Sequence, residues 1–272
     1  MKILHKTLAF LVILNLAKSQ TQIGSDIDGE AAGDEASVVS LSANGKNIAI
    51  GGYYNDASGS NAGHVRVYSY NGSAWVQLGS DIDGEAADDR SGNSVALNSD
   101  GNIVAIGGYL NDASGSNAGH VRVYSYNGSA WVQLGSDIDG EAADDRSGHA
   151  ISMNADGDRL AIGANTNDGN GSNAGHVRVF SYNGSAWVQL GSDIDGEATG
   201  DFFGYSVSMN ASGDRVAIGG SLNDGNGSNA GHVRVFSYNG SAWVQLGSDI
   251  DGEATNDEFG VSVSMNALGN RV

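Results

Sequence analysis

The chain has 272 residues, with 42 glycines, no proline and no cysteine, and its 13 basic and 32 acidic side chains give a formal charge of −19 at pH 7. The lack of cysteine excludes disulfide scaffolds, thiolate catalysis and cysteine-ligated zinc or iron–sulfur centres. The acidic excess argues against nucleic acid as a partner, because the phosphates would be repelled.

The first 19 residues have the pattern of a secretory signal peptide. Lys2 and Lys6 precede an almost wholly apolar run over 7–17, and the small residues Ala17 and Ser19 predict cleavage after Ser19. This run is too short to cross the ~30 Å hydrocarbon layer of a membrane. We therefore expect a secreted or cell-surface protein that is not inserted in the membrane once the signal is removed.

Residues 20–272 are dominated by an internal repeat of 56 residues, which is the spacing between successive tryptophans from Trp75 to Trp243. Copies begin near residues 24, 79, 135, 191 and 247. A repeat of this length is typical of a propeller blade or a solenoid unit. The chain is therefore one repeat array and not two unrelated domains.

Each copy contains four short runs with strand character and no segment with helical periodicity. In the fourth copy these runs cover residues 205–209, 215–219, 232–238 and 242–250, and Asn239-Gly240 predicts a type I′ hairpin between the last two. Four sequential antiparallel strands make one blade, and radial repetition of blades makes a propeller. The sequence predicts an all-β fold, a β-propeller of four-stranded antiparallel blades.

The number of blades follows from both ends of the repeat array. Residues 22–27 match the fourth strand of a blade, and residues 271–272 match the start of the second strand in earlier copies. We expect an incomplete propeller with four full blades, a lone first strand and part of a fifth blade, forming an open or strained arc. Closure would need about six to eight blades.

An acidic segment, Asp-Ile-Asp-Gly-Glu, recurs in each copy and places carboxylates alternately along an extended chain. Oxygen-rich, glycine-containing segments suit Ca²⁺, which takes six to eight oxygen ligands. The candidate ligands are Asp81, Asp83, Glu85, Asp137, Asp139, Glu141, Asp193, Asp195 and Glu197. The alternative is a solvated acidic surface that keeps a β-rich protein soluble and discourages edge pairing.

The third strand of each blade places a histidine, an arginine and aromatic residues on one face. In the first copy these are His64, Arg66, Tyr68 and Tyr70. Such histidines could bind a metal or ligand if they faced the central channel. We favour packing between blades, with arginine stacked on tyrosine.

Two Phe-Gly dipeptides and one Ile-Gly-Ala segment carry a family resemblance. Phe203-Gly204 and Phe259-Gly260 open strands of the fourth and fifth copies, and Ile162-Gly163-Ala164 closes a strand of the third. These residues resemble the FG-GAP repeat of the integrin α-subunit propeller, and their spacing is similar to the FG-GAP-like repeats of secreted Bacteroidetes proteins. The resemblance implies a propeller that acts in adhesion.

The resemblance also bears on calcium and on the choice of family. Integrin blades hold calcium in a loop of the form DxDxDGxxD, whereas the corresponding hairpins here shrink to residues 154–158 and 210–214. Gly51-Gly52, Tyr68 and Trp75 also follow the order of a kelch blade, which makes kelch the second choice. Both families are propellers.

No catalytic constellation is recognisable in the sequence. Catalysis needs particular residues brought together once, whereas near-identical copies present the same side chains repeatedly. The departures Lys46, His149 and Phe202 do not form a set, and no nucleophile elbow, P-loop or paired metal motif is present. We predict that the chain is not an enzyme and has no cofactor other than Ca²⁺.

The predicted function is an exported or cell-surface binding and adhesion module. Repeated loops would allow multivalent contact with an extracellular protein or glycan. One alternative is a glycan-binding propeller domain of a larger secreted carbohydrate-active enzyme. The other is a purely structural repeat module.

Overall fold

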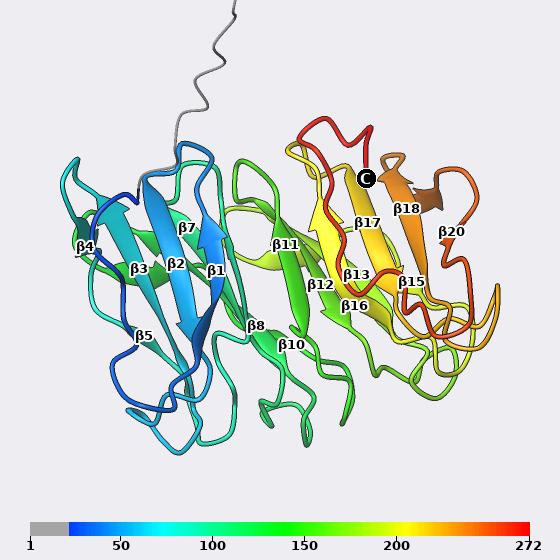
Figure 1. The fold of residues 1–272 in the computed structure, drawn as a ribbon, viewed down its shortest axis with the longest axis horizontal. Helices are drawn as coiled ribbons and strands as arrows, with labels where there is room; N and C mark the ends of the chain where they lie inside the picture. The colour runs from blue at the N-terminus through cyan, green and yellow to red at the C-terminus, as the bar shows by residue number, and fades with distance from the viewer. Residues whose placement is uncertain (1–21) are drawn as a thin grey trace, which may run out of the picture.

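The computed structural model describes residues 22–272, so the predicted signal peptide lies outside the described residues. The described chain forms twenty β-strands in four successive antiparallel sheets (Figure 1). Within this part of the chain, no helix is long and apolar enough to cross a bilayer. The predicted all-β architecture of repeated blades is confirmed.

Each sheet is one blade, in which the first four strands pair in chain order and the short fifth strand pairs with the third. Blade 1 comprises β1 (Ala36–Leu41), β2 (Asn47–Gly52), β3 (His64–Tyr70), β4 (Trp75–Gln77) and β5 (Ile82–Asp83). Blade 2 comprises β6 (Ser94–Leu97), β7 (Ile103–Gly108), β8 (His120–Tyr126), β9 (Trp131–Gln133) and β10 (Ile138–Asp139). Blade 3 comprises β11 (Ala150–Met153), β12 (Arg159–Ala164), β13 (His176–Tyr182), β14 (Trp187–Gln189) and β15 (Ile194–Asp195). Blade 4 comprises β16 (Phe203–Met209), β17 (Arg215–Gly220), β18 (His232–Tyr238), β19 (Trp243–Gln245) and β20 (Ile250–Asp251).

The fourth strand predicted for each blade is divided into two short strands. In blade 4, β19 pairs with the end of β18 through Tyr238 and Trp243, and β20 pairs with its start through His232 and Asp251. Between them Gly247 has φ +77°, a left-handed conformation that interrupts an extended strand. The first three strands of the blade form where the sequence predicted them, with β16 starting two residues earlier.

The Asn-Gly hairpin differs from the predicted type I′ turn. Only the glycine has a positive φ, which is +100° at Gly240, whereas a type I′ turn needs positive φ at both central residues. Instead the Asn239 side-chain oxygen accepts hydrogen bonds from the backbone N–H groups of Ser241 and Ala242, both at 3.0 Å. Asn239 closes this turn through its side chain and needs no left-handed backbone conformation of its own, which only Gly240 adopts.

The apolar cores lie between blades. At the first junction, Val65 of β3 packs with Val104 and Ile106 of β7, and equivalent clusters join the other neighbouring blades. Where no blade packs against blade 1, the side chains of Val39 and Leu41 are 60% and 58% exposed. Stability of the array therefore depends on contacts between neighbouring sheets.

A line of backbone hydrogen bonds joins the hairpins after the first strand of each copy. The N–H of Ala43 donates to Ser99 O, that of Ser99 to Ala155 O, that of Ala155 to Ala211 O, and that of Ala211 to Ala267 O, each at 3.0 Å. All four bonds run in the same direction at the repeat spacing. We refer to this line as the hairpin ladder.

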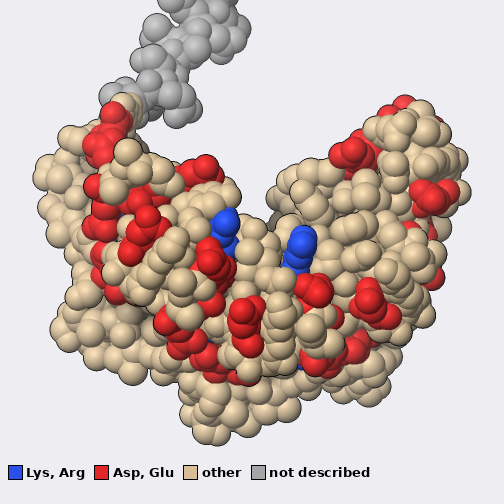
Figure 2. Space-filling model, turned by 90° about the horizontal axis from the view of Figure 1, so that it is seen from below, with Lys and Arg blue, Asp and Glu red and all other residues tan. Residues whose placement is uncertain are grey.

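The four blades form an open arc. Figure 2 shows a hollow between the N-terminal and C-terminal parts of the molecule, with basic side chains on its walls. Within residues 22–272, no hydrogen bond joins blade 1 to blade 4. Residues 22–30 lie along blade 1, where Ile23 O accepts a bond from Trp75 Nε1 at 3.0 Å and Asp28 O accepts one from Arg66 Nη2 at 2.7 Å.

Candidate functional site

The acidic segments span the junctions between blades, and their carboxylates do not converge. Asp81 lies 3.7 Å from Nδ1 of His64 in its own blade, whereas Glu85 lies 3.9 Å from Nδ1 of His120 in the next blade. Asp83 belongs to β5 between them and has an exposed side chain. The three calcium ligands predicted from one segment are therefore divided, and the same holds for the segments at 137–141 and 193–197.

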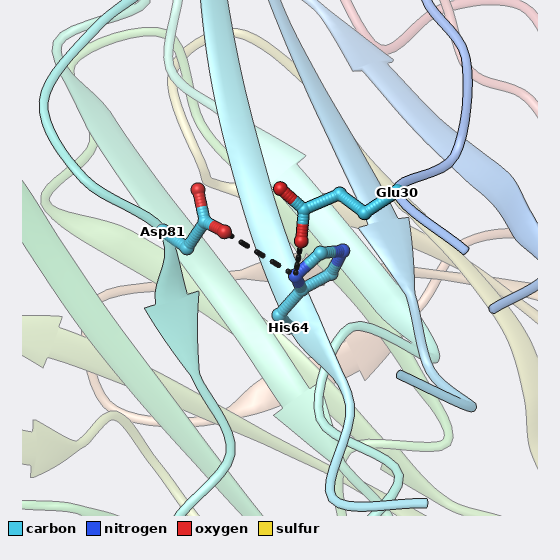
Figure 3. Close-up of side chains that lie close together, drawn as sticks. All are labelled: Glu30, His64 and Asp81. Carbon is cyan, nitrogen blue, oxygen red and sulfur yellow. Dashed lines mark ion pairs between the residues drawn. The ribbon is translucent and has the colours of Figure 1, made fainter. Parts of the chain in front are cut away.

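Each junction instead brings together a glutamate of one acidic segment with a histidine and an aspartate further along the chain. The four clusters are Glu30–His64–Asp81, Glu85–His120–Asp137, Glu141–His176–Asp193 and Glu197–His232–Asp249. In each, the potential ligand atoms lie within 4.8 Å of one another. Figure 3 shows Glu30 and Asp81 directed at the same imidazole nitrogen of His64. We call these groups the junction clusters.

The histidine is the buried member of each junction cluster. The side chain of His64 is 1% exposed, compared with 40% for Glu30 and 26% for Asp81. Backbone pairing places His64 opposite Gly52, where a Cβ atom would lie 3.0 Å from Nε2. A side chain at Gly52 would contact the imidazole. The glycine therefore lets the His64 ring pack directly against the backbone of the neighbouring strand.

The imidazoles of His120, His176 and His232 are neutral at pH 7. Burial, reinforced by the Arg178 guanidinium, lowers the pKa of His176 to about 4. Burial likewise lowers the pKa of His120 and of His232. A neutral imidazole carries a free lone pair on one ring nitrogen and can act as a ligand.

The arginine two residues after the histidine on the third strand of each blade packs against an aromatic ring, as predicted. Arg66 is 7% exposed, and its guanidinium carbon lies 5.6 Å from the centroid of the Tyr68 ring. Its Nη2 donates to Asp28 O, and its Nη1 lies 3.7 Å from Oε1 of Glu30. The shared face of this strand therefore joins one blade to the acidic segment before it.

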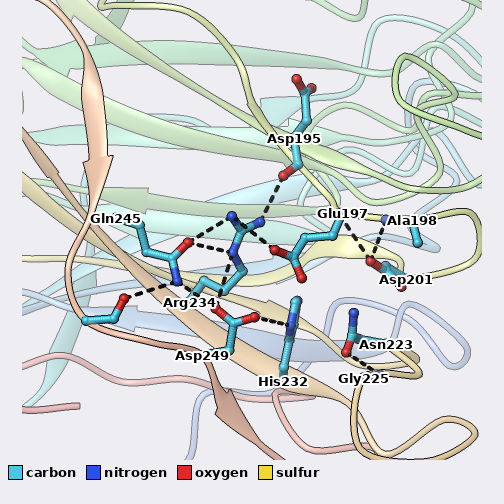
Figure 4. Close-up of polar contacts among 11 residues, drawn as sticks. Asp195, Glu197, Ala198, Asp201, Asn223, Gly225, His232, Arg234, Gln245 and Asp249 are labelled. Carbon is cyan, nitrogen blue, oxygen red and sulfur yellow. Dashed lines mark hydrogen bonds and ion pairs between the residues drawn. The ribbon is translucent and has the colours of Figure 1, made fainter.

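The fourth junction has a different arginine arrangement (Figure 4). Arg234 donates to Oε1 of Gln245 from Nε at 3.1 Å and from Nη2 at 2.9 Å. Asp249 lies 3.7 Å from both Arg234 Nε and His232 Nδ1. Arginine and histidine therefore share this carboxylate. Arg234 also lies 3.6 Å from Glu197, so the arginine–glutamate pair of the first three junctions is kept here.

A second candidate site appears where the copies differ. Two positions in each copy, three residues apart, vary between copies: they are occupied by Arg146 and His149, then by Phe202 and Tyr205, then by Glu258 and Val261. These six side chains gather around one cavity of about 520 Å³, together with Asn165, Ser221 and Leu222. We call it the variable cavity. His149 and Phe202 therefore line the same cavity, whereas Lys46 does not.

Aromatic rings contact one another at the variable cavity. The His149 ring centroid lies 4.9 Å from that of Tyr205 and 5.9 Å from that of Tyr109, with an edge-on contact to the latter. Burial lowers the pKa of His149, so this ring is also neutral at pH 7. The cavity thus offers aromatic faces and edges beside the Arg146 guanidinium.

Similar residues continue at the corresponding positions of the first two copies. The Arg90 guanidinium lies 3.9 Å from the Tyr54 ring centroid. The hydroxyl of Tyr53 donates to Oε2 of Glu35 at 2.6 Å, and this bond together with partial burial raises the pKa of Tyr53 to about 12. A row of aromatic and charged side chains therefore extends along the arc beyond the variable cavity.

His149 makes a testable contribution to acid sensitivity. Its folded-state pKa lies below the unfolded value of about 6.5, so below that pH the unfolded chain binds more protons and stability falls. Replacing His149 with asparagine, the residue at the same place in the second copy, should reduce the loss of stability on acidification. Urea midpoints at about pH 8 and about pH 5 measure this. An equal loss in both proteins would contradict the assignment.

The FG-GAP repeat family matches residues 193–236, from the acidic segment through most of β18. The chain carries an FG-GAP repeat. No curated protein matches the chain in sequence.

The FG-GAP motif has a clear structural role at the junctions. A Cβ atom on Gly163, in the second strand of blade 3, would lie 3.1 Å from the backbone carbonyl carbon of Gly204, the glycine of the Phe-Gly pair. The pairs Gly51/Gly92, Gly107/Gly148 and Gly219/Gly260 approach in the same way. The two glycines of the FG-GAP motif therefore let neighbouring blades pack backbone to backbone.

Solved structures with similar folds are larger propeller-containing proteins. The periplasmic gluconolactonase of Pseudomonas aeruginosa aligns with a TM-score of 0.54 and 14% identity, over 79% of this chain and 57% of that one. Kuenenia stuttgartiensis hydrazine synthase aligns with a TM-score of 0.50 and 12% identity, over 85% and 53% of the two chains. A Bacteroides uniformis protein, provisionally assigned as a 6-phosphogluconolactonase, gives 0.50 and 15%, over 79% and 54%. This chain spans just over half of each, and the likeness concerns the fold.

Proposed function

We propose that this FG-GAP repeat chain is an exported, non-catalytic binding module whose ligand occupies the variable cavity. The supporting observation is that residues which differ between otherwise near-identical copies gather around one cavity. Identical blades can be built if only the packing residues repeat from copy to copy. A binding site on such blades needs residues that differ between copies and lie together in space. The signal-peptide pattern at residues 1–19 supports export.

The chemistry of the cavity favours a saccharide ligand. Tyr205 and His149 present rings that can pack on the apolar faces of sugars, while Asn165, Ser221 and Arg146 supply hydrogen-bonding groups. Small-molecule sites combine such apolar walls with a few polar groups that fix orientation. Binding of a cell-surface glycan by one or several copies of this protein would suit an adhesion role.

A glycan array with the full chain tests this proposal. We expect saccharide hits whose affinity falls at least tenfold in Tyr205→Val, which installs the residue found at this position in the fifth copy. The control is Val188→Ser on β14, where the wild-type side chain is 51% exposed and does not line the cavity. No hits, or equal losses in both variants, would overturn the saccharide assignment.

Lactone hydrolysis provides a separate test of the non-catalytic role. Two of the structurally similar proteins are named as lactonases, but their identity to this chain is 14% and 15%. We expect no hydrolysis of gluconolactone above the rate in buffer alone. Turnover that is lost in Tyr205→Val would show that the variable cavity is an active site and would replace the binding proposal.

A further inference from the structure

The junction clusters contain buried nitrogen atoms without a hydrogen-bond partner. Nδ1 of His64, of His120 and of His232 is buried and unpartnered among the described residues. The nearest carboxylate oxygens lie 3.7 to 3.9 Å away, beyond hydrogen-bond distance. An unsatisfied buried polar atom costs about 1–3 kcal/mol, so its occurrence at three junctions calls for a partner.

We propose that each junction cluster binds a divalent transition-metal ion, for which zinc is the best fit. The donor set is one imidazole nitrogen and two carboxylate oxygens, which are accepted ligands of zinc with a fourth position left for water. Calcium takes oxygen ligands, so the imidazole distinguishes these clusters from a calcium site.

The observed geometry needs only small adjustment to hold an ion. Zinc ligands at about 2.0–2.2 Å from the metal lie about 3.4 Å apart in a tetrahedral site. The distances from His64 Nδ1 to Glu30 Oε2 and to Asp81 Oδ2 are both 3.7 Å. The carboxylates are partly exposed and can move, whereas the histidine is held by packing on Gly52.

The neighbouring arginine leaves one oxygen of the glutamate available. Arg66 approaches Oε1 of Glu30, and the imidazole faces Oε2 of the same side chain. The second and third junctions repeat this division of the two oxygens. The glutamate can therefore keep its ion pair with arginine while it binds a metal.

An ion in these clusters would connect neighbouring copies. Glu85 belongs to the acidic segment that closes blade 1, whereas His120 and Asp137 belong to blade 2. The coordinate bonds would supplement the apolar contacts that hold the arc together. Metal binding thus stabilises the junctions in a chain that has no cysteine for disulfides.

Zinc titration of the full chain tests the proposal. The chain is stripped with a chelator and titrated with zinc chloride against a coloured competitor, and we expect saturation at four ions per chain with a rise in melting temperature. Cobalt substitution should give the visible absorption of a four-coordinate nitrogen and oxygen site. Both measurements use the unmodified chain, so they do not depend on the folding of a variant.

Two variants of one acidic segment provide a matched comparison. Asp137→Asn removes a ligand of the second cluster and should lower the stoichiometry by one ion. Asp139→Asn, two residues away with an exposed side chain outside the clusters, should retain all four. Absence of zinc binding, binding of calcium in preference to zinc, or equal losses in the two variants would overturn the proposal.

Discussion

Replacing Gly140 with alanine is expected to cost more than about 3 kcal/mol of folding stability. A Cβ atom at Gly140 would lie 2.7 Å from the carbonyl carbon of Ala118 and closer still to its oxygen. The chain cannot easily withdraw, because the Gly140 N–H donates to Gly119 O at 2.7 Å. The obstacle is the backbone of residues 118–119, which no rotamer change relieves.

Gly128→Ala is the control for this substitution. Gly128 has φ +97° but nothing within 4 Å of a Cβ, so alanine there meets backbone strain without a clash and should cost about 1 kcal/mol. Urea denaturation of both variants gives the comparison. Equal destabilisation would show that close backbone approach at Gly140 does not limit stability.

Replacing Phe203 with alanine is expected to cost about 3–5 kcal/mol, because it empties a filled site in the core between blades 3 and 4. Phe203 is fully buried, and its ring meets those of Phe236 and His232 edge-on at 6.3 Å and 5.8 Å. The Arg234 guanidinium also lies 5.2 Å from the ring centroid. The phenylalanine of the FG-GAP motif thus contributes to a junction.

Phe259→Ala offers a comparison at the same motif position one copy later. Its side chain is 42% exposed, so the substitution should cost less than about 1 kcal/mol. Thermal and urea unfolding of the two variants measure the difference. Similar losses would mean that Phe203 acts through the local motif and not through burial between blades.

The repeat and most strands could be predicted because their determinants are local. Tryptophan spacing, alternation in runs such as His232–Tyr238 and the glycine-rich turns all lie within one copy. The division of the last strand depends on the conformation of Gly247, for which the sequence offered no distinct signal. The Asn-Gly turn was predicted in place but not in type, since Asn239 closes it through its side chain.

The candidate sites were harder to predict because they join different copies. Glu85 and His120 are 35 residues apart, and only the packing of blade 1 on blade 2 brings them together. The carboxylates of one acidic segment serve two junctions, so the three ligands predicted from that segment are not grouped at one place. The variable cavity did have a sequence signal, which is the substitution of two positions three residues apart in successive copies, as at Phe202 and Tyr205.

The hairpin ladder has a consequence for how such a chain can change in length. Its four bonds all run from an earlier copy to a later one, so every interface is of the head-to-tail kind, produced by one rotation applied repeatedly. Removing or duplicating a stretch of 56 residues, such as 79–134, would join surfaces already suited to each other. Gene duplication or deletion can therefore add or remove whole blades and so change the length of the arc. No new type of interface between blades is needed.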